Sequence, residues 1–84
     1  MSDLIVLKKY ANRRLYDTQQ SAYVTLSDVA GIIRQGKKIK AIDADTKEDV
    51  TAFVLTQIIL DEAKNNNALL PAPLLHMIIR YGHN

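Results

Sequence analysis

The chain has 84 residues, a formal net charge of +2 and no cysteine. A chain of this length forms one small domain with a limited core, and without cysteine it has neither a disulfide nor a thiolate zinc site to stabilise it. We therefore expect self-association to supply part of its stability. The longest apolar run near the start has four residues, 4–7, which is too short for a signal peptide or for the ~20 residues of a membrane-spanning helix. This favours a cytoplasmic protein.

The first half of the chain predicts mostly strands. Residues 4–10 are aliphatic and β-branched, and their alternation places Val6, Lys8 and Tyr10 on one face of a strand, with Leu7 and Lys9 on the other. Residues 14–16 and 23–25 flank the polar stretch DTQQSA and predict two short strands joined by a turn.

A short helix of roughly ten residues is predicted next. Thr25 followed by Asp28 is typical of a helix start, because the hydroxyl caps free backbone N–H groups and the carboxylate favours the positive end of the helix dipole. Apolar residues then recur at helical spacing, and Gly36 is a natural C-terminal stop. These residues are Leu26, Val29, Ile32 and Ile33.

Residues 38–44 alternate again and predict a strand, with Ile39 and Ala41 opposite Lys40 and Ile42. The stretch DADTKED, residues 43–49, has the acidic residues of a calcium loop but lacks its glycine and its closing glutamate, so a hairpin turn is the better interpretation. Thr51 is expected to cap the helix that follows.

Two apolar helices are predicted in the second half, over about residues 52–64 and 73–81. The apolar stripe of the first is wider than packing against one small sheet requires, and the second is apolar nearly all round. Such helices need to be buried, and 84 residues do not easily bury both. The pattern predicts that two chains pack together here, or that further chain covers the helices.

The charge is unevenly distributed along the chain. Residues 1–40 hold eight Lys/Arg and three Asp/Glu, whereas residues 41–84 hold three Lys/Arg and six Asp/Glu. The first half is therefore typical of a surface that faces a polyanion, and the second of a scaffold.

The segment KKYANRRLYDT, residues 8–18, carries side chains suited to nucleic acid. Lys8, Lys9, Arg13 and Arg14 lie within seven residues with no acid among them. Lysine and arginine bind phosphate, arginine also fits the guanine edge, asparagine pairs with adenine, and tyrosine stacks or bonds to phosphate. The alternative is a charged strand edge that prevents aggregation. The density of cations beside tyrosine and asparagine favours nucleic acid, bound by a strand or loop because the first helix has only Arg34 as a basic residue.

Three further cations, Lys37, Lys38 and Lys40, are candidate phosphate contacts at the rim. No nucleophile–base pair, phosphate-binding glycine loop or metal-ligand spacing is present, so we expect no catalytic residue, metal or cofactor. His76, inside an apolar helix, is expected to have a structural or interface role.

Residues 8–30 resemble the signature of the polyhydroxyalkanoate (PHA/PHB) synthesis repressor family, with the sequence KKYANRRLYDTQQSAYVTLSDVA. In these PHB accumulation regulators the signature belongs to the DNA-binding N-terminal domain. IDADTKEDVT and LTQIILDEA resemble the segment that follows in the family, and LLHMIIRYG resembles the start of its second region. The resemblance implies a bacterial regulator that represses phasin and polymer-synthesis genes and leaves DNA when it binds nascent polyester granules. It implies a DNA-contacting element made of Lys8, Lys9, Tyr10, Asn12, Arg13, Arg14 and Tyr16, with Asp17 and Thr18 shaping its turn.

The sequence therefore predicts a small α+β domain: an N-terminal β hairpin or ribbon with about three helices, completed by dimerisation. Residues 1–64 are the expected DNA-binding domain, and residues 65–84 the start of a second helical region. The expected partners are double-stranded promoter DNA, a second copy in a homodimer or higher oligomer, and PHA granules through the wider protein. The alternative function is a non-enzymatic module whose apolar helices dock a partner protein or a polyester granule.

Overall fold

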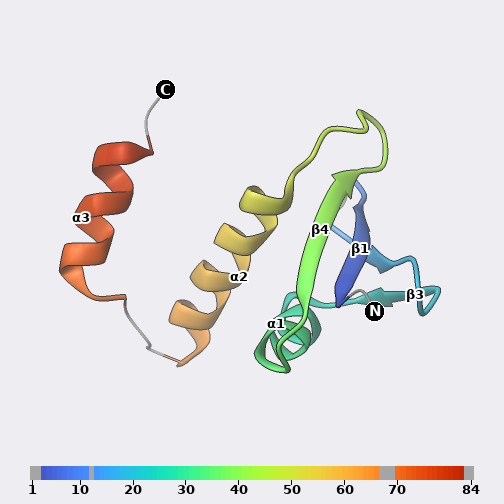
Figure 1. Ribbon diagram of the computed structural model, residues 1–84, viewed down its shortest axis with the longest axis horizontal. Helices are drawn as coiled ribbons and strands as arrows, with labels where there is room; N and C mark the ends of the chain where they lie inside the picture. The colour runs from blue at the N-terminus through green and yellow to red at the C-terminus, as the bar shows by residue number, and fades with distance from the viewer. Residues whose placement is uncertain (1–2, 12, 67–69, 83–84) are drawn as a thin grey trace.

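The computed structural model describes residues 3–11, 13–66 and 70–82 (Figure 1). Its elements follow the chain in the order β1 (Leu4–Lys9), β2 (Leu15–Asp17), β3 (Ala22–Val24), α1 (Leu26–Arg34), β4 (Lys38–Asp43), α2 (Thr51–Asn66) and α3 (Ala72–Tyr81). The protein is thus α+β, as expected, with every predicted element present and its ends shifted by one or two residues.

The four strands form one mixed sheet in the order β3-β2-β1-β4. β1, β2 and β3 make an antiparallel meander, whereas β4 pairs parallel to β1 on its other side. The chain reaches β4 through α1, which crosses back along the sheet because parallel strands need a long connection. β1 is therefore central, with the β2–β3 hairpin on one side and β4 on the other.

One face of this sheet packs on α1 and α2. Leu7 is fully buried at the centre of β1, and Ile39 and Ala41 are buried on β4 beside it. The core consists of Ile5, Leu7, Leu15, Ile39 and Ala41 from the sheet, Val29 and Ala30 from α1, and Val54 and Ile58 from α2. The alternations predicted for β1 and β4 are confirmed.

Both ends of α1 form as the sequence predicts. Thr25 Oγ1 accepts from the Asp28 N–H at 3.0 Å, and Asp28 Oδ2 accepts from the Thr25 N–H at 2.9 Å, which is a complete capping box. At the other end Gly36 adopts φ 98 and its N–H donates to Ile33 O at 2.9 Å. Arg34, in the last turn, forms an ion pair with Glu62 and so joins α1 to α2.

The acidic stretch after β4 is a turn. Asp43 Oδ1 accepts from the backbone N–H groups of Asp45 and Thr46. The hydrogen bonds from Thr46 and then Asp45 hold the pKa of Asp43 below its ordinary value. Thr51 begins α2 rather than preceding it, and its hydroxyl accepts from the Ala41 N–H at 2.9 Å, so it fastens α2 to β4.

α3 lies on the far side of α2 from the sheet (Figure 1). None of its residues is buried. We expected this apolar helix to be buried, and within one chain it is not. Across the residues that the structure describes, no helix is long and apolar enough to cross a membrane.

Candidate nucleic-acid interface

The sheet has a second face, opposite the core, and it is open. Residues paired across neighbouring strands share a face, so Lys8 on β1 lies beside Tyr16 on β2, and Tyr16 beside Tyr23 on β3. Lys8 is exposed although β1 is the central strand. A helix packed on this side would bury Lys8, so the face is accessible to a partner.

β4 adds two more cations to the open face. Lys38 pairs with Leu4, and Lys40 pairs with Val6, both on the face opposite the buried Ile5 and Leu7. Lys38 and Lys40 are exposed. Two of the three predicted rim cations, Lys38 and Lys40, therefore lie on the same surface as Lys8.

A cluster of aromatic rings occupies the hairpin end of the open face. The Tyr23 ring lies 5.2 Å from the Tyr16 ring, edge to face, and 6.2 Å from the Tyr10 ring. The Arg14 guanidinium carbon lies 4.1 Å from the centre of the Tyr23 ring, which is a cation–π contact. Tyr23 is 52% exposed, so part of the cluster meets solvent.

We define the open face by seven side chains that carry either positive charge or an aromatic ring. No acidic residue shares this face within the four strands, because Asp17 and Asp43 lie opposite it, in register with Leu7 and Lys9. Asp49 borders the face beyond β4, where it bridges to Ile42. Hydrogen bonds from Thr51, together with nearby Lys40, lower the pKa of Asp49. The seven are Lys8, Tyr10, Arg14, Tyr16, Tyr23, Lys38 and Lys40.

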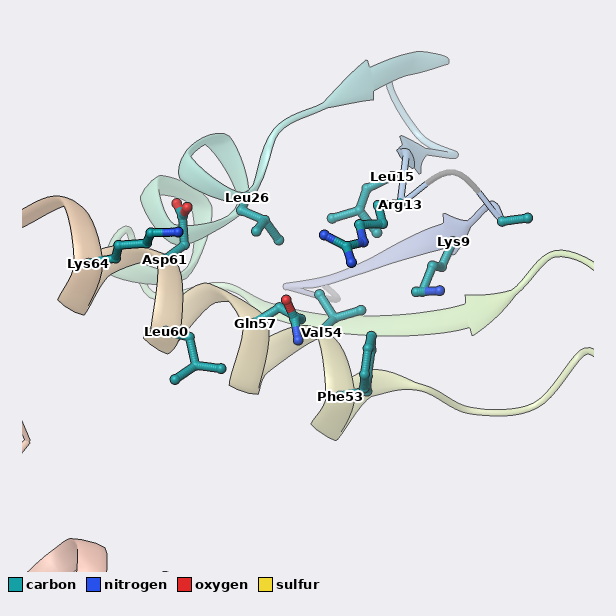
Figure 2. Close-up of a pocket in the computed structure, with 11 residues that line it drawn as sticks. Lys9, Arg13, Leu15, Leu26, Phe53, Val54, Gln57, Leu60, Asp61 and Lys64 are labelled. Atoms are coloured by element: carbon teal, nitrogen blue, oxygen red, sulfur yellow. The ribbon is translucent and has the colours of Figure 1, made fainter.

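Two of the predicted DNA-contacting cations point the other way. Lys9 alternates with Lys8, and its Nζ lies 5.4 Å from the centre of the Phe53 ring on α2. Lys9 and Arg13 line a groove of about 430 Å³ between α2 and the β1–β2 turn, and Val54 and Gln57 of α2 line its other side (Figure 2). The basic segment thus supplies two surfaces, which meet at the turn between β1 and β2.

That turn holds Arg13 in an unusual backbone conformation. The Arg13 N–H donates to Tyr10 O at 3.0 Å and the Tyr10 N–H donates to Arg14 O at 2.9 Å, which closes a three-residue connection. Arg13 has φ 67, the left-handed region that favours glycine. Ser21 and Lys47, in two other turns, are the other described residues besides glycine with positive φ.

Replacing Arg13 with glycine is expected to leave the free energy of unfolding unchanged or raise it by up to about 1 kcal/mol, because glycine adopts this conformation without a Cβ penalty. Arg13→Ala is the matched control, since it removes the same charge but keeps the strained backbone. Urea denaturation of both variants checks this. A glycine variant less stable than the alanine variant would contradict it.

Asp17 and Thr18 have structural roles in the next turn. Asp17 is fully buried, and its Oδ1 accepts from the N–H groups of Gln19 at 2.8 Å and Gln20 at 3.1 Å. Thr18 Oγ1 donates to Val6 O at 2.8 Å. Together they fix the hairpin that carries Tyr16 and Tyr23.

Of the predicted contact residues, the structure brings Lys8, Tyr10, Arg14 and Tyr16 together with Lys38 and Lys40. Lys37 is exposed just before β4, and Asn12 lies outside the described residues. Tyr23 was not among the contact residues predicted from the sequence. The signal for it was present, because a hairpin over residues 14–25 places every second residue of its two strands on one face.

An open sheet face that gathers cations and aromatic rings is typical of proteins that bind nucleic acid. The chain belongs to the family of PHB/PHA accumulation regulator DNA-binding domains, whose model matches residues 6–66. The match covers β1 from residue 6 onward, the other three strands, α1 and α2. The family is one of DNA-binding regulator domains, which implies a non-enzymatic role.

Two curated relatives are each 41% identical to the chain over 76 residues, or 90% of its length. One is an uncharacterized protein of Allochromatium vinosum, and the other is an uncharacterized protein of Thiocystis violacea in the phbA 5′ region. The chain spans 50% and 55% of these relatives, about half their length. No solved structure matches the chain.

Proposed function

We propose that this chain binds double-stranded promoter DNA through the open face of its sheet, as part of a regulator that represses polyhydroxyalkanoate synthesis and phasin genes. The observation that carries the proposal is the gathering of four cations and three tyrosines on one accessible face with no acid among its strand residues. A relative that lies in the phbA 5′ region supports a link to polymer synthesis.

The side chains of the open face divide by chemistry. Lys8, Lys38 and Lys40 neutralise phosphates, since lysine acts as a mobile point charge. Arg14 contacts base edges, because stacking on Tyr23 fixes the plane of its guanidinium fork. Lys9, Asn12 and Arg13 extend the contact with DNA along the segment that joins β1 to β2.

The wider organisation is also a proposal. Residues 1–64 are the DNA-binding domain, and residues 65–84 begin a second helical region. The regulator acts as a homodimer, whose two open faces match the two halves of a pseudo-palindromic site.

Fluorescence anisotropy with labelled promoter DNA and with scrambled DNA of equal length tests the proposal. Affinity for both is expected to fall steeply as salt rises, because binding releases condensed counterions, and the promoter is expected to bind more tightly at every salt concentration. Absence of binding to either DNA at low salt would overturn the proposal.

Arg14→Ala is expected to reduce the preference for promoter DNA by about 1–3 kcal/mol, the usual value of a bidentate base contact. Arg14→Lys is the control, since it keeps the charge but removes the planar fork. Both variants should lose specificity, and the lysine variant should retain affinity for scrambled DNA. A lysine variant with full specificity would show that Arg14 contributes charge alone.

The exposed apolar helices favour a second candidate function, a module that docks a partner protein or a polyester granule. α2 and α3 hold ten of the twelve large apolar side chains that are exposed among the described residues. Salt distinguishes the two functions, because hydrophobic docking persists at salt concentrations that release DNA. Salt-resistant attachment to granules together with no DNA binding would favour this candidate.

A further inference from the structure

α2 and α3 expose a large apolar surface. Its ten exposed side chains keep between 36% and 76% of their area accessible. Summed over the two helices, they present on the order of 1,000 Å² of apolar surface, roughly what one partner contributes to a standard protein interface. They are Phe53, Leu55, Ile59, Leu60, Leu74, Leu75, Met77, Ile78, Ile79 and Tyr81.

α3 is apolar around most of its circumference, with two polar side chains gathered on one side. His76 and Arg80 are four residues apart and therefore lie on the same side of the helix. Leu74, Ile78 and Tyr81 lie on the opposite side of the helix, because residues three or four positions apart share one side. The helix is thus suited to packing its apolar side into a groove while its polar side stays in water.

The groove beside α2 is lined by six apolar residues, four charged residues and one glutamine. Its apolar lining includes Leu15 of β2, Leu26 of α1, and Phe53 and Leu60 of α2. Figure 2 shows Phe53 and Leu60 along one side of the groove and Leu15 and Leu26 along the other. With a volume of about 430 Å³ it accommodates several apolar side chains.

The α3 of the same chain does not fill this groove. The groove lies between α2 and the β1–β2 turn, whereas α3 lies on the other side of α2 (Figure 1). Pro71 is extended, with φ −57 and ψ 138, and Pro73 follows it in the first turn, so the backbone is restricted at the start of α3 itself. Each chain therefore carries a groove with a partly apolar lining and a largely apolar helix that do not meet.

We propose that two copies of this chain associate by reciprocal exchange, with the apolar side of α3 of each copy packed into the groove beside α2 of the other. Because each copy gives one helix and receives one, the contact closes after two copies. The inference rests on the homodimer of the proposed function. Its tests are made without DNA, so they fail or succeed independently of DNA binding.

Sedimentation equilibrium of the 84-residue chain and of two matched variants tests the association. Leu74→Gln/Ile78→Gln alters the apolar side of α3, and His76→Gln/Arg80→Gln alters its polar side at the same spacing. Neither removes a buried side chain, because α3 has none. The wild type and the polar-side variant are expected to be dimers. The dissociation constant of the apolar-side variant is expected to rise at least about 100-fold, with unchanged circular dichroism of the sheet domain.

A cross-link identifies which chain supplies the helix. The chain has no cysteine, so single-cysteine chains Leu60→Cys and Leu74→Cys can be mixed and treated with a bismaleimide. The proposal predicts a covalent heterodimer of the two. A wild-type chain that stays monomeric at all concentrations, or a cross-link found only when both cysteines share one chain, would overturn it. A dimer that survives Leu74→Gln/Ile78→Gln would overturn it as well.

Discussion

Simultaneous replacement of Lys8, Lys38 and Lys40 by alanine is expected to lower affinity for DNA of any sequence on the order of 10²–10³-fold at about 0.1 M salt. The three lysines come from two neighbouring strands and lie on one face. Each phosphate that a lysine neutralises releases about 0.9 counterion, so the slope of log affinity against log salt should fall by about three units. Anisotropy titrations at several salt concentrations measure both quantities.

The matched control is the triple variant Lys47→Ala, Lys64→Ala and Arg80→Ala. It removes the three cations of residues 41–84 and changes the net charge of the chain by the same amount. These residues lie in the turn after β4, on α2 and on α3, away from the open face. The control should lose little affinity and keep most of its salt dependence. Equal losses in the two variants would mean that net charge, and not the open face, binds DNA.

The elements were predictable because their signals are local. The capping box of Thr25 and Asp28 and the left-handed Gly36 lie within a few residues of the helix they bound. The alternation of residues 4–9 also places Lys8 and Lys9 on opposite faces without any knowledge of the neighbouring strands. Sequence alone therefore identified every strand and helix.

The position of β4 was not predictable in the same way. Its parallel pairing with β1 joins Val6 to Lys40, which are 34 positions apart in the chain, and no local pattern specifies that partner. This pairing brings Lys38 and Lys40 onto the same surface as Lys8. The sequence predicts that residues 8–16 contact DNA as one element. In the sheet, they are divided between the open face and the groove.

The exposure of α3 was not predictable from the sequence for a different reason. Its composition predicts burial, but none of its residues is buried within one copy of the chain. Among the described residues, one copy of the chain holds no element that buries α3. For that reason the hydrophobic pattern identified a contact surface without identifying its partner.

Asp17→Ala is expected to lower the free energy of unfolding by about 2–3 kcal/mol, because it removes two hydrogen bonds to a buried acceptor and leaves their donors without it. Asp17 is fully buried in register with Leu7, and its Oδ1 accepts from the N–H groups of Gln19 and Gln20. Its Oδ2 is buried without a hydrogen-bond partner among the described residues. The carboxyl group therefore stabilises the turn through one oxygen while the other is desolvated at a cost.

Asp17→Asn separates these two effects. Asparagine keeps an oxygen for the turn and carries no charge, so its loss of stability in urea denaturation should be smaller than that of alanine. Because the turn positions Tyr16 and Tyr23, the alanine variant should also lose DNA affinity, with the asparagine variant between it and the wild type. Alanine and asparagine variants of equal stability would show that the hydrogen bonds of Asp17 do not hold the hairpin. The position of the aromatic cluster on the open face would then depend on strand pairing alone.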